Sequence, residues 1–170
     1  MSSVPRPKRV ARALGLDPGI ARTGFAVLES HGATLRPLTY GLLSTPTTKT
    51  HSKRLYMIER QLEKIITKFR PTHIGVERLY FSKNVSTAFA VGHARGVMLL
   101  LAARHGIEPM EFSPQEIKQT VTGYGNAEKG QVQRMVRALL CLKTIPKPDD
   151  VADALAVAYT TVTHLPWQNR

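Results

Sequence analysis

The segment 13–19, Ala-Leu-Gly-Leu-Asp-Pro-Gly, constrains the fold of this chain more than any other. Its apolar residues run directly into Asp17 and then into a Pro-Gly turn, the pattern of a buried strand that ends with a carboxylate at the edge of a sheet. A second apolar run, from Phe25 to Leu28, follows the turn and suits an antiparallel partner. We therefore expect Asp17 to lie on a central strand. The alternative is an ordinary turn in which the Asp17 side chain only caps the neighbouring backbone.

Changes in hydrophobic periodicity divide the rest of the chain into strands and helices. Further strands are predicted over 22–29, 33–43, 73–77 and 108–112. Helical spacing predicts helices over 50–70 and 85–105, a short helix from Ser113, a fourth helix, and a last helix from 148. One face of the fourth helix carries Val132, Met135, Val136, Leu139 and Leu140. Five strands with interspersed helices indicate an α/β protein.

Length and charge bound the organisation of the chain. With 170 residues we expect one domain over 11–165, a basic mobile tail over 1–10 and a short C-terminal tail over 166–170. The sequence has 24 Lys and Arg against 12 Asp and Glu, a formal net charge of +12. That excess favours a polyanionic partner, because neutralising phosphates releases condensed counterions. Charge alone does not separate an enzyme from a packaging protein.

Cysteine and apolar content indicate the compartment. Cys141 is the only cysteine and lies in an apolar run, so we expect a buried free thiol, no intrachain disulfide and a reducing environment. The longest apolar run, 97–103, is too short to cross a membrane, and the basic start of the chain has no apolar segment behind it for secretion. These features predict a soluble, cytoplasmic protein.

Three further acids stand at positions like that of Asp17. Glu77 ends a short predicted strand, and Asp150 and Asp153 lie in the first turn of the last helix, about 60° apart around its axis. Asp149 is one turn from Asp153, so the geometry also admits it, but we interpret Asp149 as the helix cap. Taken singly, each acid has the alternative explanation of a cap, a turn or a solvated end.

If these acids converge, they suit a metal site. Four neighbouring carboxylates cannot all stay ionised unless a cation neutralises them. An all-oxygen site suits Mg²⁺, with Mn²⁺ as the alternative, and paired ions can activate a water and stabilise the departing oxygen of a phosphodiester. In a protein of net charge +12, the acids would form a negative spot within a positive surface. This combination predicts a metal-dependent nuclease.

Two glycines, Gly92 and Gly96, lie one turn apart in the predicted helix 85–105, for which Asn84 is a candidate cap. Each glycine costs a helix roughly 1 kcal/mol relative to alanine. We therefore expect close packing there, on the sheet or on a second subunit. If the chain pairs with a second subunit, this helix is our candidate for the interface.

Five segments resemble a known family in their order and spacing. They are Leu-Gly-Leu-Asp-Pro-Gly at 14–19, Val-Glu at 76–77 with an aromatic loop and Ser-Lys-Asn at 82–84, Gly-His-Ala-Arg-Gly at 92–96, Lys-Gln-Thr-Val at 118–121 with Gly-Tyr-Gly-Asn-Ala-Glu-Lys at 123–129, and Asp-Val-Ala-Asp-Ala-Leu-Ala at 150–156. Together they resemble the RuvC-type Holliday junction resolvases. The resemblance covers nearly all of 13–163 and implies an RNase H-like fold, a mixed five-stranded sheet flanked by helices.

The resemblance also implies an activity and a set of site residues. The family acts as a homodimer that makes two symmetric nicks in a four-way DNA junction during recombination and repair, in association with branch-migration proteins. By position, Asp17, Glu77, Asp150 and Asp153 match its metal-binding acids. The residues implied at the DNA are Tyr80, Lys83, Asn84, Lys118 and Lys129. Tyr80 stands where the family has a phenylalanine that stacks on junction bases, and its flat ring preserves that capacity.

A mechanism follows as a hypothesis from this resemblance. Asp17 would bridge two Mg²⁺ ions, with Glu77 and the helix acids completing the site. The ions would supply an activated water and, with Lys118, stabilisation of the leaving 3′ oxygen.

Three other classes of protein share part of this evidence. A binding-only basic junction protein explains the charge but leaves the separate acids as coincidence. The stretch after Leu16 also resembles the first phosphate loop of actin-like ATPases, which need a second lobe and a second phosphate loop. An RNase H-like relative that acts on RNA is the third alternative, and competition between junction and RNA substrates distinguishes it.

Overall fold

The computed structural model describes residues 10–32, 34–79 and 85–165. Most of the two predicted tails, and the predicted site residues Tyr80, Lys83 and Asn84, lie outside these ranges. The strands within them are β1 (Ala11–Asp17), β2 (Arg22–His31), β3 (Thr34–Ser44), β4 (His73–Glu77) and β5 (Met110–Phe112). The helices are α1 (His51–Phe69), α2 (Val85–Arg104), α3 (Pro114–Thr122), α4 (Lys129–Leu139) and α5 (Asp149–Thr163).

The strands form one mixed sheet in the order β3-β2-β1-β4-β5. β1 and β2 pair antiparallel, as do β2 and β3, whereas β4 pairs parallel to both β1 and β5. The predicted α/β class and mixed five-stranded sheet are therefore confirmed. β1 is the central strand, and Asp17 is its last residue, as the sequence predicts.

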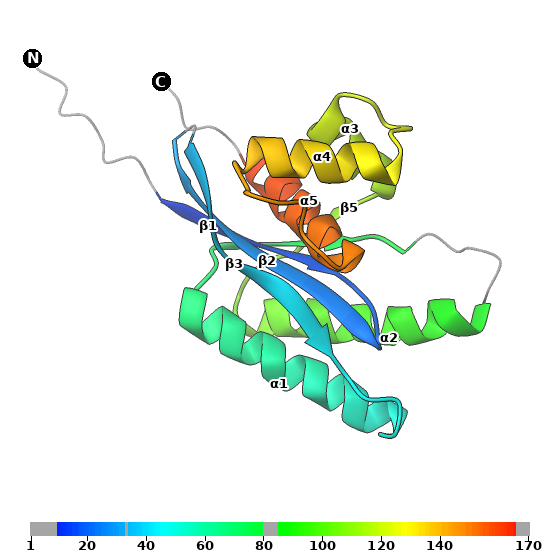
Figure 1. Ribbon diagram of the computed structural model, residues 1–170. Coiled ribbons are helices and arrows are strands. Elements are labelled where there is room, and N and C mark those ends of the chain that lie inside the picture. The colour runs from blue at the N-terminus through cyan, green and yellow to red at the C-terminus, as the bar shows by residue number, and fades with distance from the viewer. Residues whose placement is uncertain (1–9, 33, 80–84, 166–170) are drawn as a thin grey trace, which may run out of the picture.

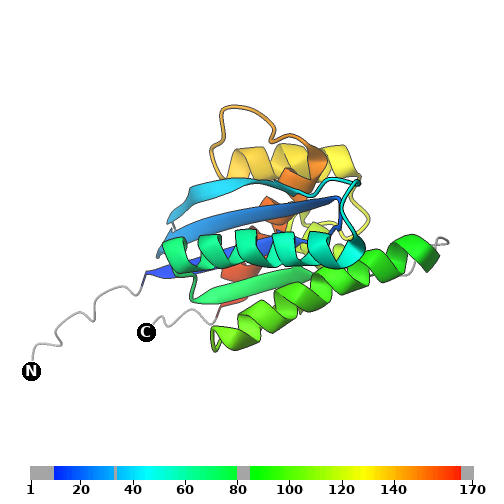
Figure 2. The same cartoon turned by 90° about the horizontal axis from the view of Figure 1, so that it is seen from below.

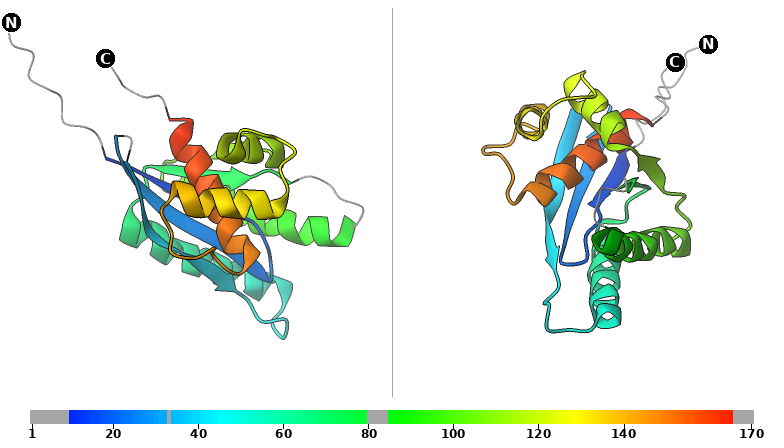
Figure 3. Two further views of the ribbon diagram at one scale, coloured as in Figure 1. Left: turned by 45° about the horizontal axis from the view of Figure 1, so that its top comes forward. Right: turned by 90° about the vertical axis from the view of Figure 1, so that its right-hand side faces the viewer.

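Helices cover both faces of the sheet (Figure 1). α1 and α2 pack on each other on one face, which Figure 2 views from below. On the opposite face α5 lies against β1, β2 and β4, and α3 and α4 pack on α5 (Figure 3). Within the described ranges, no helix is both long and apolar enough to cross a membrane.

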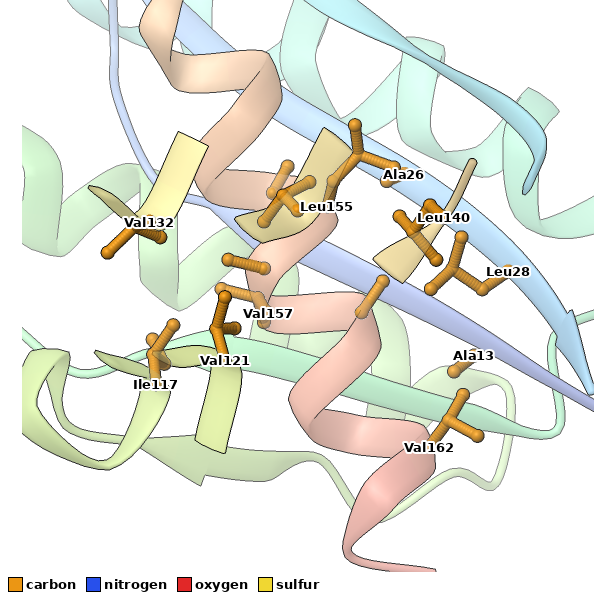
Figure 4. Close-up of a cluster of buried hydrophobic side chains, with 14 of the residues drawn as sticks. Ala13, Ala26, Leu28, Ile117, Val121, Val132, Leu140, Leu155, Val157 and Val162 are labelled. Carbon is orange, nitrogen blue, oxygen red and sulfur yellow. The ribbon is translucent and has the colours of Figure 1, made fainter. Parts of the chain in front are cut away.

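Alternation along β1 divides the buried core between the two faces. Leu14 and Leu16 are buried on the side of α1 and α2, whereas Ala13 belongs to the cluster on the side of α5. Figure 4 shows this second cluster, in which side chains of β1 and β2 meet those of α3, α4 and α5. Burial of apolar surface on both faces fixes the register of the strand, because a slip of one residue would exchange its two faces.

Three glycines, Gly15 on β1, Gly24 on β2 and Gly75 on β4, face α5. A Cβ added at either of the first two would overlap the backbone of α5, and at the third it would overlap the Thr161 hydroxyl. The helix can therefore approach the strands closely only because these positions lack side chains. This contact holds the start of α5 over the ends of β1 and β2.

The prediction that Cys141 is buried is wrong, because its side chain is exposed. α4 ends at Leu139, and Cys141 lies beyond it in a turn with φ of 51°. The helical period that buries Val136 and Leu140 therefore does not extend to the cysteine.

Two other details of the predicted helices differ. Met135 was expected on the buried face of α4 but is 37% exposed, because it lies about 100° around the helix from the buried Val136. Pro148, rather than Asp149, occupies the N-cap of α5. The Asp149 carboxylate instead accepts a hydrogen bond of 2.9 Å from Gln133 on α4, which draws it away from the helix end.

The expected close packing at the α2 glycines is absent within the described chain. A Cβ on Gly96 would meet no atom within 4 Å, and one on Gly92 would meet only Leu79, at 3.5 Å. The sheet therefore does not explain these glycines.

Strand β5 is shorter than predicted. It begins after Pro109, which has no N–H to donate to a strand partner.

Candidate active site

Asp17 and Glu77 end adjacent strands and face the same side of the sheet. The register of the parallel β1–β4 pair makes them neighbours. Side chains alternate along a strand, and Gly15 and Gly75 face α5, so the acids two residues later face it as well. The period of two therefore sets both carboxylates on the side of the sheet that α5 covers.

The first turn of α5 brings two more acids to this edge. Gly24, the ladder partner of Asp17, lies against the carbonyl oxygen of Asp150. Asp150 and Asp153 both repel the charged form of Asp17 strongly enough to affect its ionisation. The structure thus brings together the four acids that the sequence singled out, from β1, β4 and α5.

Crowding of these acids changes their ionisation. Burial, followed by repulsion from Glu77, Asp153 and Asp150, raises the pKa of Asp17 to about 8. Burial, followed by repulsion from Asp153, raises the pKa of Glu77 to about 7. Shifts of this kind concentrate at functional sites, because an isolated buried charge is costly to maintain.

Lys129, the first residue of α4, is paired with two acids of α5. Its Nζ lies 3.1 Å from Asp153 Oδ2 and 3.4 Å from Asp149 Oδ2. Burial alone would lower the pKa of Lys129, but the two carboxylates outweigh it and the net shift is upward. Burial raises the pKa of Asp153, and the ammonium group opposes this shift. Lys129 therefore stabilises negative charge at the start of α5.

A cavity of about 230 Å³ opens beside the acids. Glu77 and Asp153 line it together with both predicted lysines, Lys118 and Lys129. Lys118 reaches it from α3, whose first turn is fixed by a capping box between Ser113 and Glu116. The cavity therefore presents carboxylates and ammonium groups side by side, an arrangement suited to a phosphate and its counter-ion.

Arg22 is a site residue that the sequence analysis missed. Its Nε lies 3.4 Å from Asp150 Oδ2. The available signal was its place as the first residue of β2, two positions before Gly24 and so on the face turned toward α5.

The donor set fits a hard divalent cation. Four carboxylates offer only oxygen ligands, as Mg²⁺ and Mn²⁺ prefer, and Asp150 Oδ2 is buried without a hydrogen-bond partner among the described residues. Within those residues, no three His, Cys, Asp or Glu side chains are already arranged as metal ligands. In these residues Asp153 is paired with Lys129, and Asp150 is paired with Arg22. The oxygen donors of the site thus match such a cation, although two of the carboxylates, Asp150 and Asp153, are paired with basic side chains in this structure.

The fold and the site define an RNase H-like protein with a cluster of acids at the edge of its sheet. The family model described as "Crossover junction endodeoxyribonuclease RuvC" matches residues 13–164. The chain therefore belongs to the RuvC family.

Relatives and a solved structure agree with this assignment. The chain is 53% identical over 154 residues to a crossover junction endodeoxyribonuclease RuvC of Heliobacterium modesticaldum, covering 91% of this chain and 95% of the relative. A RuvC of Ruminiclostridium cellulolyticum is 52% identical over 145 residues, or 85% and 87% of the two chains. The structure of T. thermophilus RuvC in complex with Holliday junction substrate superimposes with a TM-score of 0.84 at 33% identity, covering 88% of this chain and 92% of that one.

Proposed function

We propose that this chain is a structure-selective endonuclease that resolves four-way DNA junctions by paired symmetric nicks. The observation that carries the proposal is the meeting of Asp17, Glu77, Asp150 and Asp153 at one edge of the sheet. The family supports it, since its members named above are crossover junction endodeoxyribonucleases and one was solved with a Holliday junction. The chain's net charge of +12 suits a DNA partner.

In this proposal the four acids hold two Mg²⁺ ions, or Mn²⁺ in their place. A divalent cation there would supply charge neutralisation and an activated water for phosphodiester hydrolysis. The protein's own contribution is positional. The sheet and α5 hold the acids in a largely buried cluster, and Lys118 adds positive charge beside Glu77 at the cavity wall. Lys118 is therefore suited to contact a backbone phosphate that enters the cavity.

The decisive test is cleavage of a labelled synthetic junction by Asp17→Asn. We expect wild-type cleavage to require Mg²⁺. The variant should not cleave, because a neutral amide binds the cation poorly. Glu108→Gln removes the same charge at an exposed site and should cleave normally. Full cleavage by Asp17→Asn would remove Asp17 from the metal site, and junction binding without cleavage by the wild type would favour a binding-only protein. Preference for an RNA competitor would favour an RNA-directed relative.

We also infer a homodimer formed through α2. Phe89 and Leu100 are 65% and 60% exposed, and Gly96 lies on the same helical stripe with open space around it. An apolar stripe with a central glycine permits close approach of a second helix. Leu100→Asp should therefore give a monomer in sedimentation, whereas Tyr56→Asp, an exposed aromatic on α1, should leave the dimer intact. A wild-type monomer at working concentration would contradict the interface.

Other roles rest on family membership. Tyr80, Lys83 and Asn84 follow β4 in the chain and are proposed to contact the junction, with Tyr80 stacking on its bases. Tyr80→Ala should then bind junctions nearly normally but resolve them poorly, and unchanged resolution would exclude stacking. Location in the cytoplasm and association with branch-migration proteins belong to the same proposal.

A further inference from the structure

Asp150 is the only one of the four acids with an arginine partner among the described residues. Its Oδ2 is buried and accepts no hydrogen bond there, and the nearest cation is Arg22, whose Nε lies 3.4 Å away. The Arg22 side chain is 58% exposed, whereas that of Asp150 is 22% exposed. The pair therefore has one buried end in the acid cluster and one end in solvent.

Hydrogen bonds on both sides of the turn place Arg22 there. The Thr23 hydroxyl donates to the carbonyl of Gly19 at 2.6 Å, and the Thr45 hydroxyl donates to the carbonyl of Ile20 at 2.5 Å. The Thr45 amide also donates to the carbonyl of Ala21 at 3.1 Å. The turn between Asp17 and β2 is therefore held by Thr23 at the start of β2 and by Thr45, the residue that follows β3. Arg22 emerges from a fixed backbone rather than from a loose loop.

Arg22 and Lys129 serve different acids. Lys129 spans Asp149 and Asp153, whereas Arg22 contacts Asp150. The chemistry of the two cations also differs, because a guanidinium offers a planar fork of donors that matches a phosphate, and an ammonium is a compact point charge. An exposed guanidinium beside the proposed metal site is thus equipped to bind either a carboxylate or a DNA phosphate.

We propose that Arg22 is a positioning residue that exchanges partners, pairing with Asp150 in the free protein and with a DNA phosphate once a divalent cation occupies Asp150. The inference rests on the proposed metal-nuclease function and deepens it. A cation and a guanidinium compete for the same buried oxygen, so the arrival of one releases the other. The released side chain keeps its charge at the exposed edge of the acid cluster, where its guanidinium is free to bind a backbone phosphate.

The exchange predicts that Arg22 weakens metal binding when no DNA is present. In a Mn²⁺ titration followed by the EPR signal of the free ion, Arg22→Gln should bind about threefold more tightly than the wild type, the scale of a partly exposed ion pair. In an Asp150→Asn background the same substitution should have no effect. Arg36→Gln, an exposed arginine at the far end of the β2–β3 ladder, is the matched control. Equal Mn²⁺ affinity of Arg22→Gln and wild type overturns the exchange.

Junction binding provides the second arm. With Ca²⁺ present, the slope of log affinity against log salt should fall by about one for Arg22→Gln, because one phosphate contact is lost. With EDTA present, the slopes of variant and wild type should coincide, because Arg22 is then engaged by Asp150. A difference of one in both conditions, or in neither, overturns the exchange and leaves the proposed function standing. A wild-type protein that binds no Mn²⁺ overturns the proposed metal site and this inference with it.

Discussion

Asp17 holds its proton in the folded protein up to about pH 8, whereas the ordinary pKa of the group is 3.8. The folded state therefore binds more protons than the unfolded chain between these values, and stability falls as pH rises through that window. Asp17→Asn removes the free-energy cost of ionising this buried carboxyl group. In EDTA, we expect this variant to melt above the wild type near pH 8, with a difference that shrinks toward pH 4, in thermal melts across the range.

Asp149→Asn is the control with the opposite sign. A hydrogen bond from Gln133, and then Lys129, lowers the pKa of Asp149, so its charged form favours the folded state. That variant should melt below the wild type near neutral pH and approach it in acid. If Asp17→Asn instead melts below the wild type near pH 8 in EDTA, the ionised Asp17 carboxylate does not destabilise the folded protein and its pKa is not raised.

The same raised pKa values link metal binding to protons. Asp17 and Glu77, with pKa values of about 8 and about 7, are substantially protonated at neutral pH and must lose protons to act as ligands. Mn²⁺ affinity should therefore rise with pH up to about 8, with proton release. Calorimetry in buffers of different ionisation enthalpy measures that release. Glu77→Gln should release fewer protons than the wild type, and a pH-independent affinity would exclude these two acids as ligands.

At this scale the sequence indicates which acids matter but not how they are paired. Asp17 and Glu77 follow from strands that end in an acid, and Asp153 follows from helical spacing. The pairing of Lys129 with Asp153, and of Arg22 with Asp150, depends on how α4 and β2 pack against α5. Alternation along β2 predicts the face on which Arg22 lies, but no local pattern encodes its contact with Asp150, nor the contact that draws Asp149 away from the cap position.

Among the elements, α5 depends most on its contacts, since it lies on strand glycines. A methyl group at Gly24 would overlap the carbonyl oxygen of Asp150 and push the first turn of α5 away from Asp17. Gly24→Ala should lower thermal stability and also reduce junction cleavage, measured on the folded fraction. Gly41→Ala is the milder control, since its Cβ would lie 3.2 Å from the edge of the Phe25 ring. If Gly24→Ala cleaves junctions as well as the wild type does, the position of the first turn of α5 does not determine activity.

Element boundaries were predictable where periodicity was strong and where caps were local. The predicted helix 50–70 corresponds to α1, with Thr50 accepting from the Lys53 amide at 3.4 Å. The short helix predicted from Ser113 corresponds to α3, and Ser113 is its N-cap. The end of α4 was not predictable in the same way. Its apolar run continues past Leu139, whereas the chain turns there, so the burial of Cys141 was overestimated.

For the molecule as a whole, charge is the property that the sequence states most directly. An excess of 12 positive charges should make junction affinity fall steeply with salt, as counterions are released from each contacted phosphate. Fluorescence anisotropy over a series of salt concentrations measures the slope. A slope near zero would argue against the basic surface as the DNA contact. Charge does not predict the order of the strands or the face of the sheet on which each helix packs. The order was predictable only through the family resemblance, and the faces depend on side-chain packing.

The acids of the candidate site come from β1, β4 and the first turn of α5, which lie far apart along the chain. During translation, the ribosome releases β1 and β4 long before α5. A nascent chain that has not yet docked α5 therefore has only two of the four acids, Asp17 and Glu77, and lacks the helix that covers this edge of the sheet. If the proposed site is correct, the capacity to cut DNA therefore depends on the docking of one late helix.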